Sequence, residues 1–189
     1  KKLLRSIAYL PKNRVAATLT VALVGMIATY LNWGLGMIAG ALVAKEIARV
    51  FKGRGVKVDY AVLIAACHAG NIIRGPSSSI PLEVTAESSI VYEIVGDIIP
   101  TTATLYSSWN LIITVLVLIS GLITYALICP RESECIEIQQ AVLDADAARE
   151  EAEEKAHAAK SWKDMDFAEK LDNFAPLAII PALIVVAYM

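Results

Sequence analysis

Long stretches without a charged side chain alternate with short charged segments along this chain. Residues 15–44, 60–73 and 98–130 contain no Asp, Glu, Lys or Arg. Uncharged apolar stretches of ~18 residues or more are typical of membrane-spanning helices, and the middle stretch falls short of that length. The pattern therefore predicts an all-α integral membrane protein in which the middle stretch needs an explanation of its own.

The first uncharged stretch, residues 15–44, is too long for one upright membrane helix. A single helix of that length would measure ~45 Å, whereas the hydrocarbon core of a bilayer is ~30 Å thick. Its middle reads NWGLG, and Asn32, Gly34 and Gly36 are poor helix residues that favour turns. We therefore predict a re-entrant helical hairpin over residues 15–44, with its tip near residues 32–36 and both ends on one side of the membrane.

A broken transmembrane helix is predicted over residues 59–87. The apolar run YAVLIAACHAGNII leads into RGPSSSIP, where one glycine, two prolines and three serines interrupt the helical pattern. A helix rises only ~22 Å between Asp59 and Ile73, so the interruption is expected inside the membrane. A surface loop with capping serines is the alternative interpretation of the same residues.

Positive charge defines the predicted orientation. Lys and Arg gather on both sides of residues 15–44, whereas residues 75–130 contain neither. Because Lys and Arg mark the cytoplasmic ends of membrane spans, both ends of the hairpin are expected in the cytoplasm and residues 82–106 outside. The sequence thus predicts a multi-pass protein of the plasma membrane, which in a bacterium is the inner membrane.

The other segments complete one passage through the membrane and begin the next. They are predicted as a cytoplasmic interfacial helix over 1–14, a cytoplasmic basic segment over 45–58, an outer segment over 88–106, a transmembrane helix over 107–129, an acidic cytoplasmic helical linker over 130–174 and the start of a further transmembrane helix over 175–189. The last apolar run is too short to cross a bilayer. We therefore expect the chain to be an internal piece of a longer membrane protein.

Three motifs give the chain a resemblance to a known family. They are NWGLGMIAGALVAKEIAR, SSIPL and VGDIIPTTATLYSSWNLI, and with their spacing they span most of residues 10–175. In these motifs the chain resembles the short-chain fatty acid transporter family, within the ion transporter superfamily of inverted-repeat carriers. The resemblance implies an ion-coupled, alternating-access carrier of short-chain carboxylates such as butyrate or acetoacetate, and not an enzyme.

The resemblance also implies a binding site shared between two inverted repeats. This chain holds one repeat and the start of the second, so it supplies half a site at most and needs the missing second repeat as a partner. The pattern usual in the family, roughly WHGGLSGSIPL, is altered here. The expected Trp and His are absent and Arg74 has appeared, which leaves the identity of the substrate open.

Candidate substrate-binding residues lie at the helix break and at the hairpin tip. They are Arg74, Gly75, Ser77, Ser78, Ser79 and Trp33. Hydroxyl groups and the free N–H groups of a half-helix attract a carboxylate, and an arginine can pair with one in a bidentate manner. Alternatively, Arg74 lies at the outer interface or pairs with a neighbouring acidic residue, and Trp33 fills the bundle instead of packing on substrate methylenes.

Candidate ion-binding or proton-relay residues form a second set. They are Asn32, Gly34, His68 and Asn71. Amide oxygens and exposed backbone carbonyls can coordinate Na⁺, and a histidine can relay protons. A packed, hydrogen-bonded core histidine is the alternative for His68. We expect Na⁺ or H⁺ as the coupling ion, with no other metal and no organic cofactor.

Two other functions fit the same sequence. One is a carrier of the same fold for a dicarboxylate or an amino-acid-like anion, and the other is a non-transporting membrane scaffold or channel subunit. The expected partners are the small carboxylate and the lipid bilayer, with a homo-oligomer as an option and no nucleic acid. Cys67, Cys129 and Cys135 form no CxxC pair, and we expect inert, reduced thiols.

Overall fold

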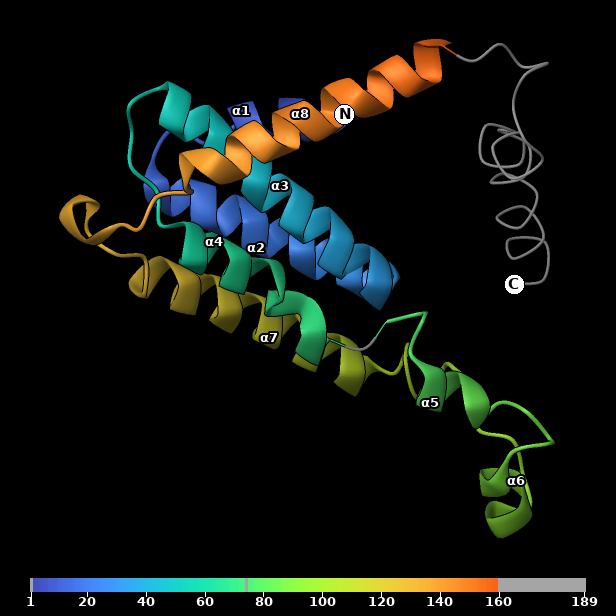
Figure 1. The fold of residues 1–189 in the computed structure, drawn as a ribbon. Helices are drawn as coiled ribbons and strands as arrows, with labels where there is room; N and C mark the ends of the chain where they lie inside the picture. The colour runs from blue at the N-terminus through green and yellow to red at the C-terminus, as the bar shows by residue number, and fades with distance from the viewer. Residues whose placement is uncertain (1, 74, 160–189) are drawn as a thin grey trace. The chain divides into compact units, whose positions relative to one another are not determined.

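Helices make up the regular structure of this protein (Figure 1). The computed structural model describes residues 2–73 and 75–159, and that part of the chain contains no strand. In chain order the helices are α1 (Lys2–Tyr9), α2 (Arg14–Leu31), α3 (Trp33–Gly53), α4 (Tyr60–Cys67), η1 (Ala69–Ile72), α5 (Ser79–Glu83), α6 (Ile90–Val95), α7 (Ser108–Leu127), η2 (Glu132–Glu134) and α8 (Gln140–Ala159). The predicted all-α fold class is confirmed. The chain divides into two units, the first ending at Ile138 and the second beginning at Gln139 with α8.

A single residue, Asn32, separates α2 from α3. Its backbone is extended (φ −155°, ψ 124°), and its N–H donates to the carbonyl oxygen of Ala28 at 2.8 Å, which closes α2. Its side-chain oxygen accepts the N–H of Leu35 at 3.1 Å, which caps the start of α3. The two helices therefore form a hairpin with a one-residue turn, and they lie side by side in Figure 1.

Helix α3 extends beyond the uncharged stretch in which the hairpin was predicted. It runs to Gly53 and includes the charged residues that follow that stretch. Ile47 and Phe51, one turn apart, are fully buried, and the Arg49 guanidinium pairs with the Glu46 carboxylate at 2.9 Å. Because the buried face continues through the charged residues, the helix does not end where the charges begin.

Small residues let three helices approach closely at the centre of the first unit. A Cβ atom at Gly25 of α2 would lie 2.6 Å from the carbonyl oxygen of Cys67, and one at Gly40 of α3 would lie 2.7 Å from the Cys67 Cβ. Neither distance leaves room for a side chain, and Cys67 itself is fully buried. Glycine on both arms of the hairpin is therefore required for α4 to pack against it, a mode of contact typical of membrane helices.

Polar contacts gather at the end of the first unit that lies away from the hairpin tip. The Asp59 carboxylate caps α4 by accepting the N–H of Val62 at 2.8 Å, and it also accepts the N–H of Ile136 at 2.9 Å. The Lys52 ammonium donates to the carbonyl oxygen of Ile138 at 2.8 Å. These bonds tie the segment that follows α7 to the connection between α3 and α4.

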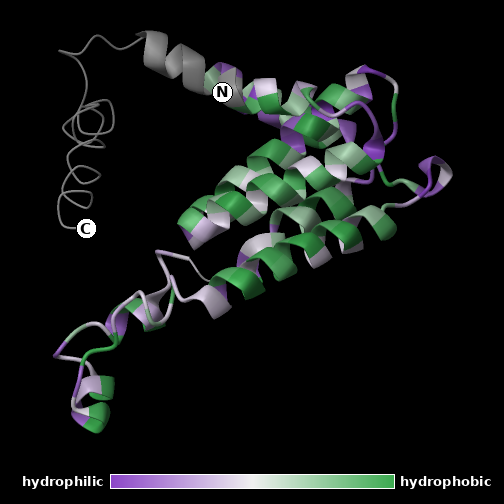
Figure 2. Cartoon of the chain, turned by 180° about the vertical axis from the view of Figure 1, so that it is seen from behind, coloured by the Kyte–Doolittle hydropathy of each residue, from purple (hydrophilic) through white to green (hydrophobic). Residues whose placement is uncertain are grey.

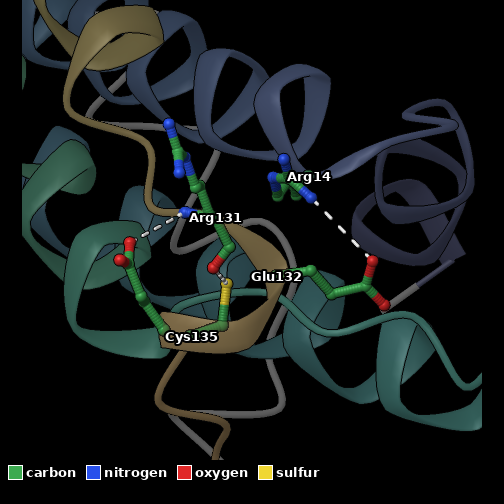
Figure 3. A network of polar contacts seen from close by, with 5 residues as sticks. Arg14, Arg131, Glu132 and Cys135 are labelled. Atoms are coloured by element: carbon green, nitrogen blue, oxygen red, sulfur yellow. Dashed lines mark hydrogen bonds and ion pairs between the residues drawn. The ribbon is translucent and has the colours of Figure 1, made fainter.

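Helix η2 adds a second group of polar contacts at this end (Figure 3). The N–H of Arg131 donates to Glu134 Oε2 at 3.4 Å, and the thiol of Cys135 donates to the carbonyl oxygen of Arg131 at 3.3 Å. The Arg14 guanidinium lies 4.0 Å from the Glu132 carboxylate. Both of these charged groups are partly exposed, so solvent screens the pair and it adds little stability. The hydrophilic colouring of η2 in Figure 2 marks the same region.

Helix α7 is apolar along most of its length (Figure 2). Ser107 caps it by accepting the N–H of Asn110 at 3.3 Å, and no residue of the helix is buried within this chain. In the described part of the chain, α2 and α7 are the helices long and apolar enough to cross a membrane, by length and composition. An exposed apolar surface of this extent suits a lipid environment better than water.

The segment predicted as a broken helix consists of short pieces. Helix α4 ends at Cys67, η1 ends at Ile72 and α5 begins at Ser79. Helix α8 covers the middle of the predicted acidic linker. Residues 160–174 of that linker, the predicted transmembrane start over 175–189 and Arg74 lie outside the described residues.

Candidate functional site

A cavity with both polar and apolar lining residues lies where the hairpin tip meets the broken segment. Its volume is about 400 Å³. Its walls come from α2, α3 and the chain from η1 to α5, both included: Thr29, Trp33, Met37, Asn71, Ile73, Ser77, Ser78, Ser79, Ile80 and Pro81. None of these lining residues carries a formal charge. The two stretches that the sequence singled out separately, NWGLG and RGPSSSIP, thus contribute to one cavity.

A closed turn over residues 75–78 forms part of the cavity wall. The N–H of Ser78 donates to the carbonyl oxygen of Gly75 at 2.9 Å, and the N–H of Gly75 donates to Ser78 Oγ at 3.1 Å. Pro76, inside the turn, has no N–H that needs a partner. A Cβ atom at Gly75 would collide with the carbonyl oxygen of Tyr30 at the end of α2. Glycine is therefore what allows the turn to lie against the hairpin.

One hydrogen bond joins this turn to the hairpin tip. The N–H of Trp33 donates to Ser77 Oγ at 3.3 Å, across 44 residues of sequence. Trp33 is the first residue of α3, where backbone N–H groups have no partner within the helix. Ser77 therefore satisfies one of these groups and fixes the turn to the start of α3.

The serine hydroxyls at the turn have no acceptor among the described residues. A hydroxyl group can donate one hydrogen bond and accept two. The oxygens of Ser77 and Ser78 each accept a backbone N–H, and neither hydroxyl donates to another residue in the described part of the chain. The hydroxyl of Ser79, at the first position of α5, lines the same cavity. The cavity thus presents donors to a small ligand that accepts hydrogen bonds.

The other candidates from the hairpin tip and α4 are placed differently. Asn71 lines the cavity, whereas Asn32 and Gly34 form the hairpin tip without lining it. His68 is exposed and does not line the cavity; its Nδ1 lies 3.0 Å from Cys67 Sγ and 3.1 Å from the Ile64 carbonyl oxygen. Within the described residues, no three His, Cys, Asp or Glu side chains come together as a metal site.

The structure adds Thr29, which the sequence analysis did not single out. Thr29 lines the cavity with only 3% of its surface exposed, and its Oγ1 has no hydrogen-bond partner in the part of the chain that is described. Leaving a buried hydroxyl without a partner costs about 1–3 kcal/mol. The available sequence signal was a threonine one turn before the Asn32 break, inside an apolar helix.

Comparisons with known proteins agree on one family. The profile of the family described as "Short chain fatty acid transporter" matches residues 1–189. A protein of Escherichia coli strain K12 is 31% identical over 191 residues, which cover all of this chain and 40% of the relative. A protein of Haemophilus influenzae is 32% identical over 187 residues, which cover 94% of this chain and 39% of the relative. Both are named "Putative short-chain fatty acid transporter".

The chain thus spans about two fifths of the length of these relatives. No solved structure matches it.

Proposed function

The chain belongs to the short-chain fatty acid transporter family, and on this basis we propose that it is part of a secondary active carrier for short-chain carboxylates such as butyrate or acetoacetate. Membership of this family makes it a transporter component of a membrane and not an enzyme. The apolar helices α2 and α7 support a membrane setting. In the proposal, the protein crosses a bacterial inner membrane several times.

The cavity at the hairpin tip is the observation that carries the proposal. The hydroxyls of Ser77 and Ser78 offer two donors to a carboxylate, and Trp33 and Met37 offer apolar contact to a short hydrocarbon chain. Helix α5 also begins at this cavity, at Ser79, and backbone N–H groups at a helix start favour an anion. A small carboxylate with an apolar tail uses both kinds of surface.

Alternating access and ion coupling complete the proposal. The hairpin of α2 and α3 would enter the membrane from the cytoplasm and place its tip partway across, and a second inverted repeat would supply the other half of the site. Na⁺ would use oxygens at Asn32, Gly34 and Asn71, or H⁺ would use the ring of His68. Arg74, beside the turn in sequence, would pair with the carboxylate.

Uptake into proteoliposomes tests this proposal. The complete protein that contains this chain is reconstituted, and labelled butyrate uptake is measured with and without an inward Na⁺ or H⁺ gradient. We expect saturable uptake that the gradient accelerates and that acetoacetate inhibits, whereas butanol, which lacks the carboxylate, does not. Absence of saturable uptake of every small carboxylate refutes the proposal. A non-saturating flux without coupling would identify a channel, and saturable uptake of a dicarboxylate alone would change the substrate class.

A further inference from the structure

The hydroxyl group of Thr29 is buried beside the proposed binding cavity without a partner. Thr29 lies on α2, one turn before the residue that ends the helix. It is one of the lining residues of the cavity, and its Oγ1 forms no hydrogen bond with any described residue. Buried polar groups are nearly always paired in folded proteins, so each exception requires a reason.

Other threonines of the same helix show what an ordinary pairing looks like. The hydroxyl of Thr18 donates to the carbonyl oxygen of Arg14 at 3.2 Å, and the hydroxyl of Thr20 donates to that of Ala16 at 2.7 Å. Each bond reaches back one turn, as is common for helical threonines. Thr29, the one threonine of α2 that lines the cavity, makes no such bond.

Two glycines leave the space that the Thr29 side chain occupies. A Cβ atom at Gly70 of η1 would lie 2.7 Å from Thr29 Oγ1, and a Cβ atom at Gly36 of α3 would collide with the same oxygen. The hydroxyl therefore sits where α2, α3 and η1 meet. Packing at this junction shields the hydroxyl from bulk water, so rotation of the Thr29 side chain toward the cavity is what would give it a partner.

We propose that Thr29 is a ligand-contacting residue whose hydroxyl donates a hydrogen bond to the carboxylate of the carried anion, an inference that rests on the proposed function. The oxygens of Ser77 and Ser78 each accept one backbone N–H, and their hydroxyl hydrogens have no acceptor among the described residues, so each can donate to a ligand. Thr29 lines the same cavity from the hairpin side, and in the proposal its side chain turns so that the hydroxyl becomes a third donor to the ligand. An anion bound by all three hydroxyls would link the hairpin to the turn over residues 75–78.

The test compares two identical substitutions on one helix. Thr29→Val removes the cavity hydroxyl at nearly constant volume, and Thr18→Val is the matched control, because Thr18 is equally buried on α2 but is paired within the helix. Thr29→Ser keeps the hydroxyl. Butyrate binding by titration calorimetry, the KM of uptake and the midpoint of thermal unfolding are measured on the complete protein.

Thr29→Val is expected to weaken butyrate binding and to raise KM by roughly tenfold or more, the effect of losing a hydrogen bond to a charged group. Its unfolding midpoint should stay unchanged or rise, because a methyl group replaces an unpaired hydroxyl. Thr29→Ser should remain within about threefold of the wild-type protein, and Thr18→Val should leave binding unchanged. Should Thr29→Val fail to fold, Thr29→Cys, with a weak donor, is expected to weaken binding in the same direction.

Each remaining outcome decides against one proposal or both. Equal binding by the wild-type protein and Thr29→Val, or equal losses in Thr29→Val and Thr18→Val, would overturn the role of Thr29 while leaving the carrier intact. Butyrate binding that depends on Thr29 but is not accompanied by uptake would refute the proposed carrier function. It would still support the proposed contact between Thr29 and the ligand. A wild-type protein that neither binds nor transports a small carboxylate would refute both.

Discussion

Gly75 lies so close to the carbonyl oxygen of Tyr30 that no Cβ atom fits between them. This contact joins the turn over residues 75–78 to the end of α2, and it is how the broken segment comes to share a cavity with the hairpin. A side chain at position 75 would have to displace a backbone carbonyl and not a flexible side chain. The geometry of the cavity therefore depends on this glycine.

Gly75→Ala is expected to impair the site by pushing the turn away from α2. Overpacking of a close contact typically costs about 1–3 kcal/mol, and we expect a lower unfolding midpoint together with a KM for butyrate raised roughly tenfold. Gly53→Ala is the matched control, because a Cβ atom there meets nothing within 4 Å. Equal unfolding midpoints and equal KM values for both variants would contradict the proposed contact.

Ser78→Ala is expected to weaken butyrate uptake by roughly tenfold or more, because it removes a donor to the carboxylate. It also removes the acceptor of the Gly75 N–H, which should loosen the turn. Ser79→Ala should act in the same direction through the loss of a cavity hydroxyl. Ser120→Ala on α7 is the control, since that hydroxyl donates to the Val117 carbonyl oxygen within its own helix. Membrane insertion and KM are measured together, and an unchanged KM in Ser78→Ala would remove this hydroxyl from the site.

The all-α fold class could be predicted from the sequence, and the helix break at Asn32 falls within the NWGLG motif. An uncharged stretch predicts a helix that can leave water, and the NWGLG motif predicts a break in a helix. Both predictions depend only on residues that are neighbours in the sequence. The length of the turn, a single residue at Asn32, was harder to predict. It requires the Asn32 side chain to cap α3 while the Asn32 backbone closes α2. The extension of α3 to Gly53 was missed since burial of Phe51 against other helices outweighs local charge.

The cavity was predictable only in part. Trp33 and Ser77 were expected at one site, and both line the cavity through a bond between distant segments. Thr29 could not be found from sequence, because three threonines in α2 have similar surroundings in the chain. Which of them lacks a partner depends on tertiary packing around Gly36 and Gly70. The depth of the hairpin in the membrane stays a prediction.

Arg54 connects α1 to the end of α3, and its replacement by lysine is expected to release α1. The guanidinium donates to the carbonyl oxygens of Pro11 at 3.0 Å and of Tyr9 at 3.3 Å, and it lies 5.3 Å from the centre of the Tyr9 ring. Lysine cannot reproduce this fork of donors. Trypsin cleavage after Lys12 should become about fivefold faster or more, as loss of ~1 kcal/mol of local stability would produce. Lys57→Ala, at an exposed position near by, should leave the cleavage rate unchanged; an unaltered rate in Arg54→Lys would argue against the connection.

Asp59→Asn is expected to destabilise the first unit, because one side-chain oxygen accepts the N–H of Val62 and the other accepts that of Ile136. Asparagine has one acceptor oxygen, so one of these two part-buried N–H groups loses its bond to the carboxylate, at a cost of about 1–3 kcal/mol. The unfolding midpoint in detergent should therefore fall. Asp97→Asn is the matched control, since Asp97 is exposed and accepts only the N–H of Ile98. Similar midpoints for the two variants would show that the Asp59 carboxylate does not fasten the segment after α7.

Cys135 is expected to be a slowly reacting thiol whose reactivity depends on Asp59. Burial raises the pKa of the Cys135 thiol, and the nearby Asp59 carboxylate raises that pKa further. Because the thiolate is the reactive form, a raised pKa leaves less of it at neutral pH, and alkylation should reach its half-maximal rate at a higher pH than for an ordinary thiol.

Iodoacetamide modification of a variant with Cys135 as its sole cysteine checks this expectation. The same variant, unfolded in detergent, is the reference. Its alkylation rate should reach half of its maximum at a lower pH than that of the folded protein. Asp59→Asn removes a negative charge, so it should shift the folded profile toward lower pH and speed the reaction at neutral pH. A midpoint that matches the unfolded reference in the folded protein would rule out the raised pKa, and a midpoint unmoved by Asp59→Asn would leave burial as its cause.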